Sequence, residues 1–194
     1  MDFNLKGKVI FFATGNIHKF NEARVVLAQC GLAVGMLREK ALEIQNDSLA
    51  EIATSSAIDA HKRCHLPLIV EDAGLFVEAL KGFPGPYAAY VYKTVGNAGL
   101  LKLMQGAQNR KAIFRSVIAY CDNEKTECFE GEVSGEIATR EKKINAKSAF
   151  GFDPIFQPDR SEKTFAQMSL EEKNGYSHRA QAIRKFADWY KTLH

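Results

Sequence analysis

The pattern of apolar positions along the chain predicts strands that alternate with helices. Residues 8–13 (KVIFFA) are a short β-branched and aromatic run, which is typical of a buried strand. Apolar residues then recur at helical spacing from about Ile17, and Gly31 stands where a left-handed C-terminal cap is expected. The start of the chain therefore predicts a strand, a turn and a helix.

The same pattern continues through the first half of the chain. Strand-like runs at residues 32–37 and 41–45 precede a helix, which a capping box at residues 48–51 opens. Residues 68–71 (LIVE) predict a second buried strand, and we expect it to end at the polar turn of residues 72–74. Two strand ends in this half are thus expected to carry polar residues.

The second half of the chain predicts antiparallel strands. Residues 112–121 and 127–139 alternate between apolar and polar side chains, and a turn at residues 122–124 joins them into a long hairpin. Ser169 is expected to begin a short helix and Ser177 the final one. The sequence therefore predicts a mixed α/β protein, with βα units first and antiparallel strands later.

Composition favours a single globular domain over residues 1–194. The chain is 46% hydrophobic and 25% charged, which excludes disorder, collagen and coiled coil. The longest uncharged stretch of the first half, residues 25–37, is shorter than a membrane-spanning helix requires. The N-terminus also lacks the pattern of a signal peptide, so we expect a cytoplasmic protein with no membrane partner. A net charge of +3 favours small anionic ligands over nucleic acid.

One group of residues has the spacing of a metal site. His61 and His65 lie at positions i and i+4 of a predicted helix with Cys64 between them, which a transition metal could use. No second set of ligands accompanies them, and surface histidines explain the same pattern. The four cysteines form no CxxC pair, so reduced thiols are expected.

Residues after the first strand have the character of a phosphate site. Thr14, Gly15 and Asn16 lie where ligands collect in an α/β sheet, and the following helix directs its unpaired N–H groups there. Lys19 adds a positive charge one turn later. No GxxxxGK[ST] or GxGxxG motif occurs, so the common nucleotide-binding loops are excluded. An ordinary Asn-capped helix with a solvated lysine is the alternative explanation.

Carboxylates at the ends of strand-like segments suggest a magnesium site. Glu43 follows one such segment, and Glu71 and Asp72 follow another. Carboxylate oxygens together with phosphate oxygens and water are the usual ligands of Mg²⁺. We therefore expect these acids near one edge of the sheet, with Asp72 the strongest candidate for a functional role.

The start of the final helix carries cations where acids are usual. Ser177 is followed by His178 and Arg179 in the first turn, a placement that the helix dipole disfavours. Such misplaced charge often marks a ligand site, because a carbonyl or phosphate can offset it. A Ser–His hydrolase is a competing interpretation, but no GxSxG motif is present.

Together these motifs resemble one family, the inosine triphosphate pyrophosphatases, which hydrolyse non-standard purine nucleoside triphosphates. The similarity extends from about residue 9 to residue 190. The matching segments, in the family's order, are Ala13-Thr14-Gly15-Asn16 with Lys19 and Glu22, Leu42-Glu43-Ile44-Gln45, Glu71-Asp72-Ala73-Gly74-Leu75, Gly82-Phe83-Pro84-Gly85-Pro86-Tyr87, Phe150-Gly151-Phe152-Asp153-Pro154-Ile155-Phe156, Glu172-Lys173-Asn174 and Ser177-His178-Arg179.

The resemblance implies an elongated mixed β-sheet with two α/β lobes around a central cleft, in a homodimer. It implies that Glu43 and Asp72 hold Mg²⁺, with Glu71 close by, and that Asp72 is the general base. Phe150 would stack on the purine. The substrate-binding residues that it implies are Thr14, Gly15, Asn16 and Lys19 for the phosphates, Ala73, then Phe150, Gly151, Phe152 and Asp153 around the base and sugar, and Lys173, His178 and Arg179 at the base edge.

The sequence departs from the family's commoner pattern at three positions. Ser56 and Ala89 stand where relatives often carry basic residues, and Ala73 replaces a usual Ser or Thr. Either Lys19 carries more of the phosphate charge, or another cation such as Lys93 or Arg115 reaches the site.

The function implied is hydrolysis of ITP, dITP and XTP to the monophosphate and pyrophosphate. Selectivity would follow from the 6-oxo group, which accepts hydrogen bonds where the 6-amino group of adenine donates them. A pyrophosphatase of the same fold for other modified nucleotides and a non-catalytic nucleotide sensor remain alternatives. A nucleic-acid-binding protein is a further alternative, suggested by the basic residues Arg140, Lys142, Lys143 and Lys147.

Overall fold

The computed structural model describes residues 9–38, 42, 44–142 and 150–193. Its strands are β1 (Val9–Ala13), β2 (Ala33–Leu37), β3 (Leu68–Val77), β4 (Pro84–Gly85), β5 (Lys111–Cys121), β6 (Thr126–Ile137) and β7 (Phe156–Pro158). Its α-helices are α1 (Ile17–Gln29), α2 (Leu49–Cys64), α3 (Ala88–Thr94), α4 (Gly96–Leu103), α5 (Leu170–Tyr176) and α6 (His178–Lys191), with 3₁₀ turns at Glu78–Leu80 and Phe165–Gln167.

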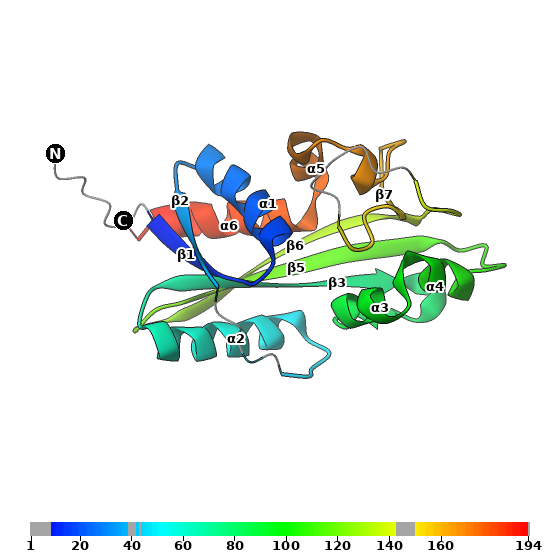
Figure 1. Ribbon diagram of the computed structural model, residues 1–194. Helices are drawn as coiled ribbons and strands as arrows, with labels where there is room; N and C mark the ends of the chain where they lie inside the picture. Colours follow the sequence, from blue (N-terminus) through cyan, green and yellow to red (C-terminus); the bar gives the residue numbers. More distant parts are fainter. Residues whose placement is uncertain (1–8, 39–41, 43, 143–149, 194) are drawn as a thin grey trace.

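Within the described residues, the strands form one mixed sheet of seven strands. Its order is β2-β1-β3-β5-β6-β7, and β4 pairs with β3 outside this path. β1 is parallel to both β2 and β3, whereas β3, β5 and β6 are antiparallel neighbours. The long strands β3, β5 and β6 give the molecule its elongated shape (Figure 1). The predicted mixed α/β class with an elongated sheet is confirmed.

Helices cover both faces of this sheet. α1 and α6 lie on one face, where Phe12, Ile118 and Phe186 belong to one buried apolar cluster. α2 lies on the opposite face and packs Ala53 and Ala57 against β3 and β5 (Figure 1). At the far end of the long strands, α3 and α4 lie on the α2 side and α5 and β7 on the α6 side.

The first turn of α6 lies directly against β6. A Cβ atom built at Gly131 of β6 would be 2.1 Å from the carbonyl oxygen of His178. Only glycine permits this approach, because real Cβ atoms do not come so close to a backbone atom. The absence of a side chain at Gly131 therefore allows the start of α6, with His178 and Arg179, to pack directly on the sheet.

Most predicted elements are confirmed, but two strand predictions are wrong. β3 continues through residues 72–74 to Val77, because β5 pairs with it along its whole length. Leu42, Ile44 and Gln45 form no strand, and residues 41 and 43 lie outside the described part of the chain. Asp59 and Ser56 of α2 bind the N–H and the C=O of Leu42 at 3.0 and 3.3 Å, in place of a strand partner.

The helix starts were predicted more reliably. Ser48 caps α2 by accepting a hydrogen bond from the N–H of Glu51, as expected. The second half of the expected capping box is replaced, since the Glu51 carboxylate accepts a hydrogen bond from Asn46. Ser169 and Ser177 cap α5 and α6. None of the helices that the structure describes has the length and apolar character needed to cross a membrane.

Candidate active site

The site is built around a stretch of β3 that has a strand partner on one side only. β1 pairs with Leu68 and Ile69, and β4 pairs with Leu75 and Phe76, both on the side of β3 away from β5. Among the described residues, no strand covers residues 70–74 on that side. This part of β3 therefore presents an open edge, at which a ligand can contact groups from both faces of the sheet.

Backbone groups of β3 point into this open edge. The carbonyl oxygen of Glu71 does so, because Lys19 Nζ donates a hydrogen bond to it at 3.1 Å. In a strand the N–H and C=O of residues two apart point the same way. The N–H of Ala73 is therefore also directed at the open edge, beside Lys19.

Alternation along β3 places Glu71 and Asp72 on opposite faces. Glu71 is buried under α1 and α6. Asp72 lines a cavity of about 640 Å³ on the other face, together with Ile52 of α2 and Tyr87 before α3. The two neighbouring acids, which were expected near one edge of the sheet, therefore lie on different faces of it and contact different groups.

Both oxygens of the Glu71 carboxylate contact protein groups. Its Oε1 accepts hydrogen bonds from Ser116 Oγ at 2.6 Å and from Arg179 Nε at 3.0 Å. Its Oε2 forms an ion pair with Lys19 Nζ at 2.8 Å. Burial alone would raise the pKa of Glu71, but Arg179 and Lys19 outweigh burial and hold this pKa well below its usual range. The group is a buried anion whose Oε2 makes an ion pair with Lys19 but accepts no hydrogen bond among the described residues. Because both oxygens already contact protein cations, it is a poor metal ligand.

Glu22 of α1 joins the two cations of the site. Its Oε1 accepts a hydrogen bond from Lys173 Nζ at 2.6 Å, and its Oε2 accepts one from Arg179 Nη1. Lys173 also donates to Asp153 Oδ2 at 2.7 Å. Burial opposes charge on Lys173, but Asp153 and Glu22 outweigh it and raise the pKa of Lys173. Both cations are therefore held charged and fixed.

Phe150 lies beside these cations. Lys173 Nζ and the Arg179 guanidinium carbon are 5.0 and 5.5 Å from the centre of its ring. The N–H of Phe150 donates to Asp153 Oδ2 at 3.0 Å, so one carboxylate positions both Phe150 and Lys173. The imidazole of His18 stacks on the same ring, with centroids 5.2 Å apart and planes inclined by 19°.

The rest of the 150–153 loop fixes this arrangement. Gly151 has φ +61°, which favours glycine, and its carbonyl oxygen accepts a hydrogen bond from Asn97 Nδ2 at 3.4 Å. Phe152 is buried and packs against the edge of Tyr92. Of the predicted residues in this loop, Phe150 and Gly151 are partly accessible, whereas Phe152 and Asp153 lie beneath them.

His178 completes the group with a neutral side chain. Its ring stacks on Phe114 at 4.7 Å with an inclination of 6°. Burial lowers the pKa of His178 well below its usual value, and Arg179 lowers it further. Its Nδ1 is buried and has no hydrogen-bond partner within the described part of the chain. His178 therefore contributes an uncharged ring with one buried, unpartnered nitrogen.

The N-terminus of α1 lies next to this cluster through Lys19. Asn16 is the N-cap and accepts hydrogen bonds from the N–H groups of His18 and Lys19 at 2.9 and 3.3 Å, while Thr14 Oγ1 accepts one from Asn16. The Asn-capped helix considered from the sequence is thus present. Its lysine is not simply solvated, since the Lys19 side chain is 21% exposed and paired with Glu71.

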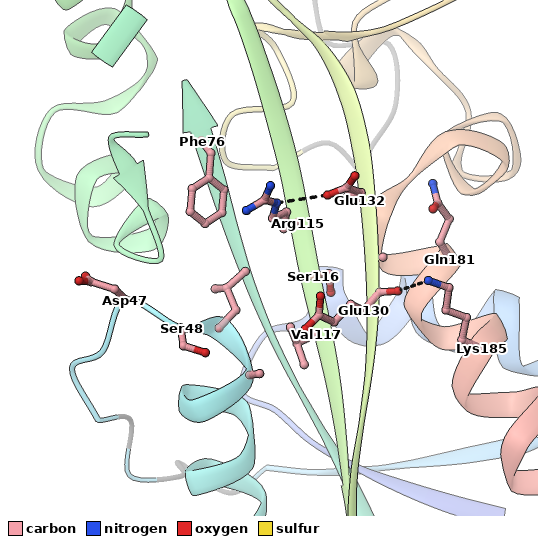
Figure 2. A pocket seen from close by; sticks show the side chains of 13 residues that line it. Asp47, Ser48, Phe76, Arg115, Ser116, Val117, Glu130, Glu132, Gln181 and Lys185 are labelled. Atoms are coloured by element: carbon pink, nitrogen blue, oxygen red, sulfur yellow. Dashed lines mark hydrogen bonds and ion pairs between the residues drawn. The ribbon is translucent and has the colours of Figure 1, made fainter. Parts of the chain in front are cut away.

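Lys93 and Arg115, the two cations considered as replacements, do not line the Asp72 cavity. Lys93 is exposed on α3. Arg115 lines a different cavity of about 400 Å³, where it pairs with Glu132 at 3.3 Å and lies over the Phe76 ring (Figure 2). Glu43, the other predicted magnesium ligand, lies outside the described residues.

The alternative metal site at His61 and His65 is not formed. His61 Nδ1 lies 2.8 Å from the carbonyl oxygen of Leu66, and its Nε2 lies 3.1 Å from Asn123 Oδ1. His65 instead caps α2 in a left-handed conformation. Across the described ranges, no group of three or more His, Cys, Asp or Glu could hold a metal ion.

Three residues of the cluster had no predicted role. Glu22 lies in one of the motifs that match the family. Its charge, on the helix that carries Lys19, could have indicated that it belongs to the site. His18 precedes Lys19 and gave no separate signal. Ser116 lies inside an apolar strand run, and only the register of β5 against β3 brings it to Glu71.

Comparison with known proteins identifies the family. The Ham1 family model matches residues 10–189. The chain belongs to the Ham1 family. It is 51% identical over 180 residues to a dITP/XTP pyrophosphatase of Thermococcus kodakarensis, covering 93% of this chain and 96% of that one. It is 48% identical over 183 residues to a protein of the same name from Methanopyrus kandleri, with 94% and 96% covered.

Solved structures of Ham1 proteins have the same fold. The Staphylococcus aureus Ham1 protein is similar with a TM-score of 0.80 at 30% identity, covering 96% of this chain and 100% of that chain. A Ham1 protein from Coxiella burnetii also has a TM-score of 0.80, at 28% identity, with 95% and 98% covered. The resemblance noted in the sequence is confirmed for this Ham1-family chain.

Buried, neutral His178 makes stability depend on pH. Below its ordinary pKa of 6.5 the unfolded chain binds a proton at this residue and the folded chain does not, so acidification favours unfolding. We expect the free energy of unfolding to fall between pH 7.5 and 5.5. The contribution of His178 reaches at most about 1.4 kcal/mol per pH unit.

Urea unfolding at several pH values measures this fall. His178→Gln should have a smaller fall than the wild type, whereas His65→Asn, at the exposed end of α2, should keep the wild-type fall. Equal falls in His178→Gln and the wild type would contradict the prediction.

Proposed function

We propose that this protein hydrolyses non-standard purine nucleoside triphosphates, such as ITP, dITP and XTP, to the monophosphate and pyrophosphate. The observation that carries the proposal is the open edge of β3. Fixed cations surround an aromatic ring on one face of the strand, and a cavity lined by a carboxylate lies on the other. The names of the curated relatives support the same reaction.

The base would bind on the Phe150 side. Phe150 stacks on the purine, while Lys173, Arg179 and His178 bind the edge of the base. Lys173 and Arg179 are fixed donors, so they pair with a 6-oxo group and leave a 6-amino group mismatched. Discrimination against adenine of about 10² to 10⁵ is typical of such a hydrogen-bonded site. Asp153 contributes indirectly, by holding the Phe150 N–H and Lys173.

The phosphates would cross the open edge of β3. The N-terminal turn of α1, formed by Thr14, Gly15 and Asn16, offers the positive end of the helix dipole to the phosphates. Lys19 contributes a charge, and the backbone N–H of Ala73 is a further donor at the edge. This N–H remains although Ala73 has no hydroxyl group.

The Asp72 cavity fits a magnesium ion together with substrate. Mg²⁺ is commonly bound by one or two carboxylates, with phosphate oxygens and waters as its other ligands. Asp72, with Glu43, would hold the ion, and a set of three protein ligands is not required. When bound, Mg²⁺ neutralises charge that develops on the phosphate oxygens. Glu71 does not take part, because its oxygens bind Ser116, Arg179 and Lys19.

Asp72 would act on the attacking water. The water oxygen forms a bond to the α-phosphorus, the bond from this phosphorus to the α–β bridging oxygen breaks, and pyrophosphate leaves with that oxygen. Asp72 orients the water and accepts its proton. Lys19 and the α1 N-terminus stabilise the departing pyrophosphate.

We also propose a homodimer that involves the outer wall of the Asp72 cavity. Exposed apolar side chains gather there, including Phe83 at 42%, Tyr90 at 70% and Leu103 at 55% exposure. Contiguous apolar surface of this kind often marks a protein interface. A second copy of the chain would cover these side chains and narrow the cavity.

Product analysis tests the proposed reaction. ITP, dITP, XTP, GTP and ATP are incubated with the protein with and without Mg²⁺, and monophosphate plus pyrophosphate is separated from diphosphate plus phosphate. We expect Mg²⁺-dependent monophosphate and pyrophosphate from ITP, dITP and XTP, with little product from ATP or GTP. Nucleotide binding without turnover would favour a non-catalytic sensor, and equal turnover of GTP and ITP would contradict the selectivity.

Asp72→Asn tests the catalytic carboxylate. Loss of the proton acceptor should lower kcat for ITP by about 10²-fold or more, with an unchanged circular dichroism spectrum. Asp47→Asn is the matched control, because Asp47 is exposed and lines the other cavity. Near-normal turnover by Asp72→Asn would contradict the role of Asp72.

Light scattering during size-exclusion chromatography tests the dimer. The wild type should elute with twice the mass of one chain, 21.6 kDa. Tyr90→Glu places a charge on the exposed apolar surface and should shift the population to monomer, whereas Lys62→Glu on α2 should not. A monomeric wild type, or a dimer unaffected by Tyr90→Glu, would contradict the proposal.

A further inference from the structure

His18 makes a contact that the proposed reaction does not use. It is the second residue of α1, and its backbone N–H is fixed by the N-cap Asn16. Its imidazole is half-buried and lies against Phe150, with ring centroids 5.2 Å apart and planes inclined by 19°. This is an offset stacked pair of aromatic rings.

The pair leaves no room for a base between its rings. Stacked carbon atoms lie about 3.5 Å apart, so two rings with a purine between them need a separation of roughly 7 Å. The observed centroid distance of 5.2 Å is shorter. A purine that stacks on Phe150 where His18 now lies must therefore replace the imidazole.

The other groups over Phe150 cannot move aside as readily. Lys173 is held by Glu22 and Asp153, and Arg179 by Glu22 and Glu71, all of them buried. Among the described residues, the His18 side chain makes no hydrogen bond or ion pair, and the stack on Phe150 is its one aromatic contact. Rotation about its side-chain bonds frees the ring and leaves the helix cap intact.

We propose that His18 covers the stacking surface of Phe150 until a purine displaces it. The inference rests on the proposed function, in which Phe150 stacks on the base. Each purine that enters breaks the stack of His18 on Phe150 as it forms its own stack on Phe150. His18 is then a residue of the base subsite that weakens the binding of every purine, while selection of a 6-oxo base over a 6-amino base remains with Lys173 and Arg179.

Steady-state kinetics of His18→Ala tests this role. Removal of the competing ring should lower KM for ITP and the dissociation constant of IMP by about 2- to 10-fold, the range that an aromatic pair contributes, with kcat unchanged. The ratio of kcat/KM for ITP to that for ATP, which reports on the 6-oxo selection by Lys173 and Arg179, should also be unchanged. His18→Phe is the matched control, because a phenyl ring restores the stack and should not lower KM.

Proton NMR of the histidine rings tests the contact in the free protein. The His18 ring protons, assigned by their loss in His18→Ala, should be shielded by Phe150 and should lose this shielding in Phe150→Leu. Addition of IMP to the wild type should move the His18 signals toward their Phe150→Leu positions. Signals that do not respond to IMP, while IMP binds, would overturn the proposal.

The two proposals fail in different ways. If no triphosphate is hydrolysed and IMP does not bind, the proposed function is wrong and His18 covers no base site. If ITP is hydrolysed but His18→Ala has the wild-type or a higher KM, the function stands and the role of His18 is overturned.

Discussion

The buried network of charges around Glu22 and Glu71 is the interaction on which the site depends. Each charge would be costly alone in the protein interior, and removal of one partner from a buried pair typically costs about 3–5 kcal/mol. Glu22 binds Lys173 and Arg179, and Glu71 binds Arg179 and Lys19. Because every charge has an opposite partner, the start of α1, the middle of β3 and the helices α5 and α6 are held in one arrangement.

This network also determines what the site can recognise. Lys173 and Arg179 are cations at neutral pH, because their carboxylate partners raise the pKa of each side chain and outweigh the effect of burial. They can donate hydrogen bonds but not accept them. His178 stays neutral beside them, because burial and the positive charge of Arg179 both disfavour its protonated form. A ligand edge rich in acceptors matches these groups, and one rich in donors does not.

The sequence predicted the parts of this arrangement that depend on local pattern. α1, α6 and the β5–β6 hairpin follow from apolar spacing and cap residues such as Ser177, and the motifs pointed to Lys19 and Arg179. Residues 72–74 look like a turn, and only pairing with β5 makes them part of a strand. The separation of Glu71 from Asp72 then follows from the strand, and the contact of Ser116 with Glu71 follows from the register. These features depend on partners far away in the sequence.

The two faces of β3 differ in how negative charge is balanced. On the Glu71 face, protein cations neutralise the carboxylates. On the other face, the described residues that line the cavity are uncharged apart from Asp72, and Ala89 stands where relatives often have a basic residue. Ser56 is buried beneath this region and donates to the Leu42 carbonyl. A triphosphate that extends into this cavity needs cations from elsewhere, which Lys19 supplies in part. The proposed dependence on Mg²⁺ therefore follows from the lack of cations among the described residues that line the cavity, as well as from the Asp72 carboxylate.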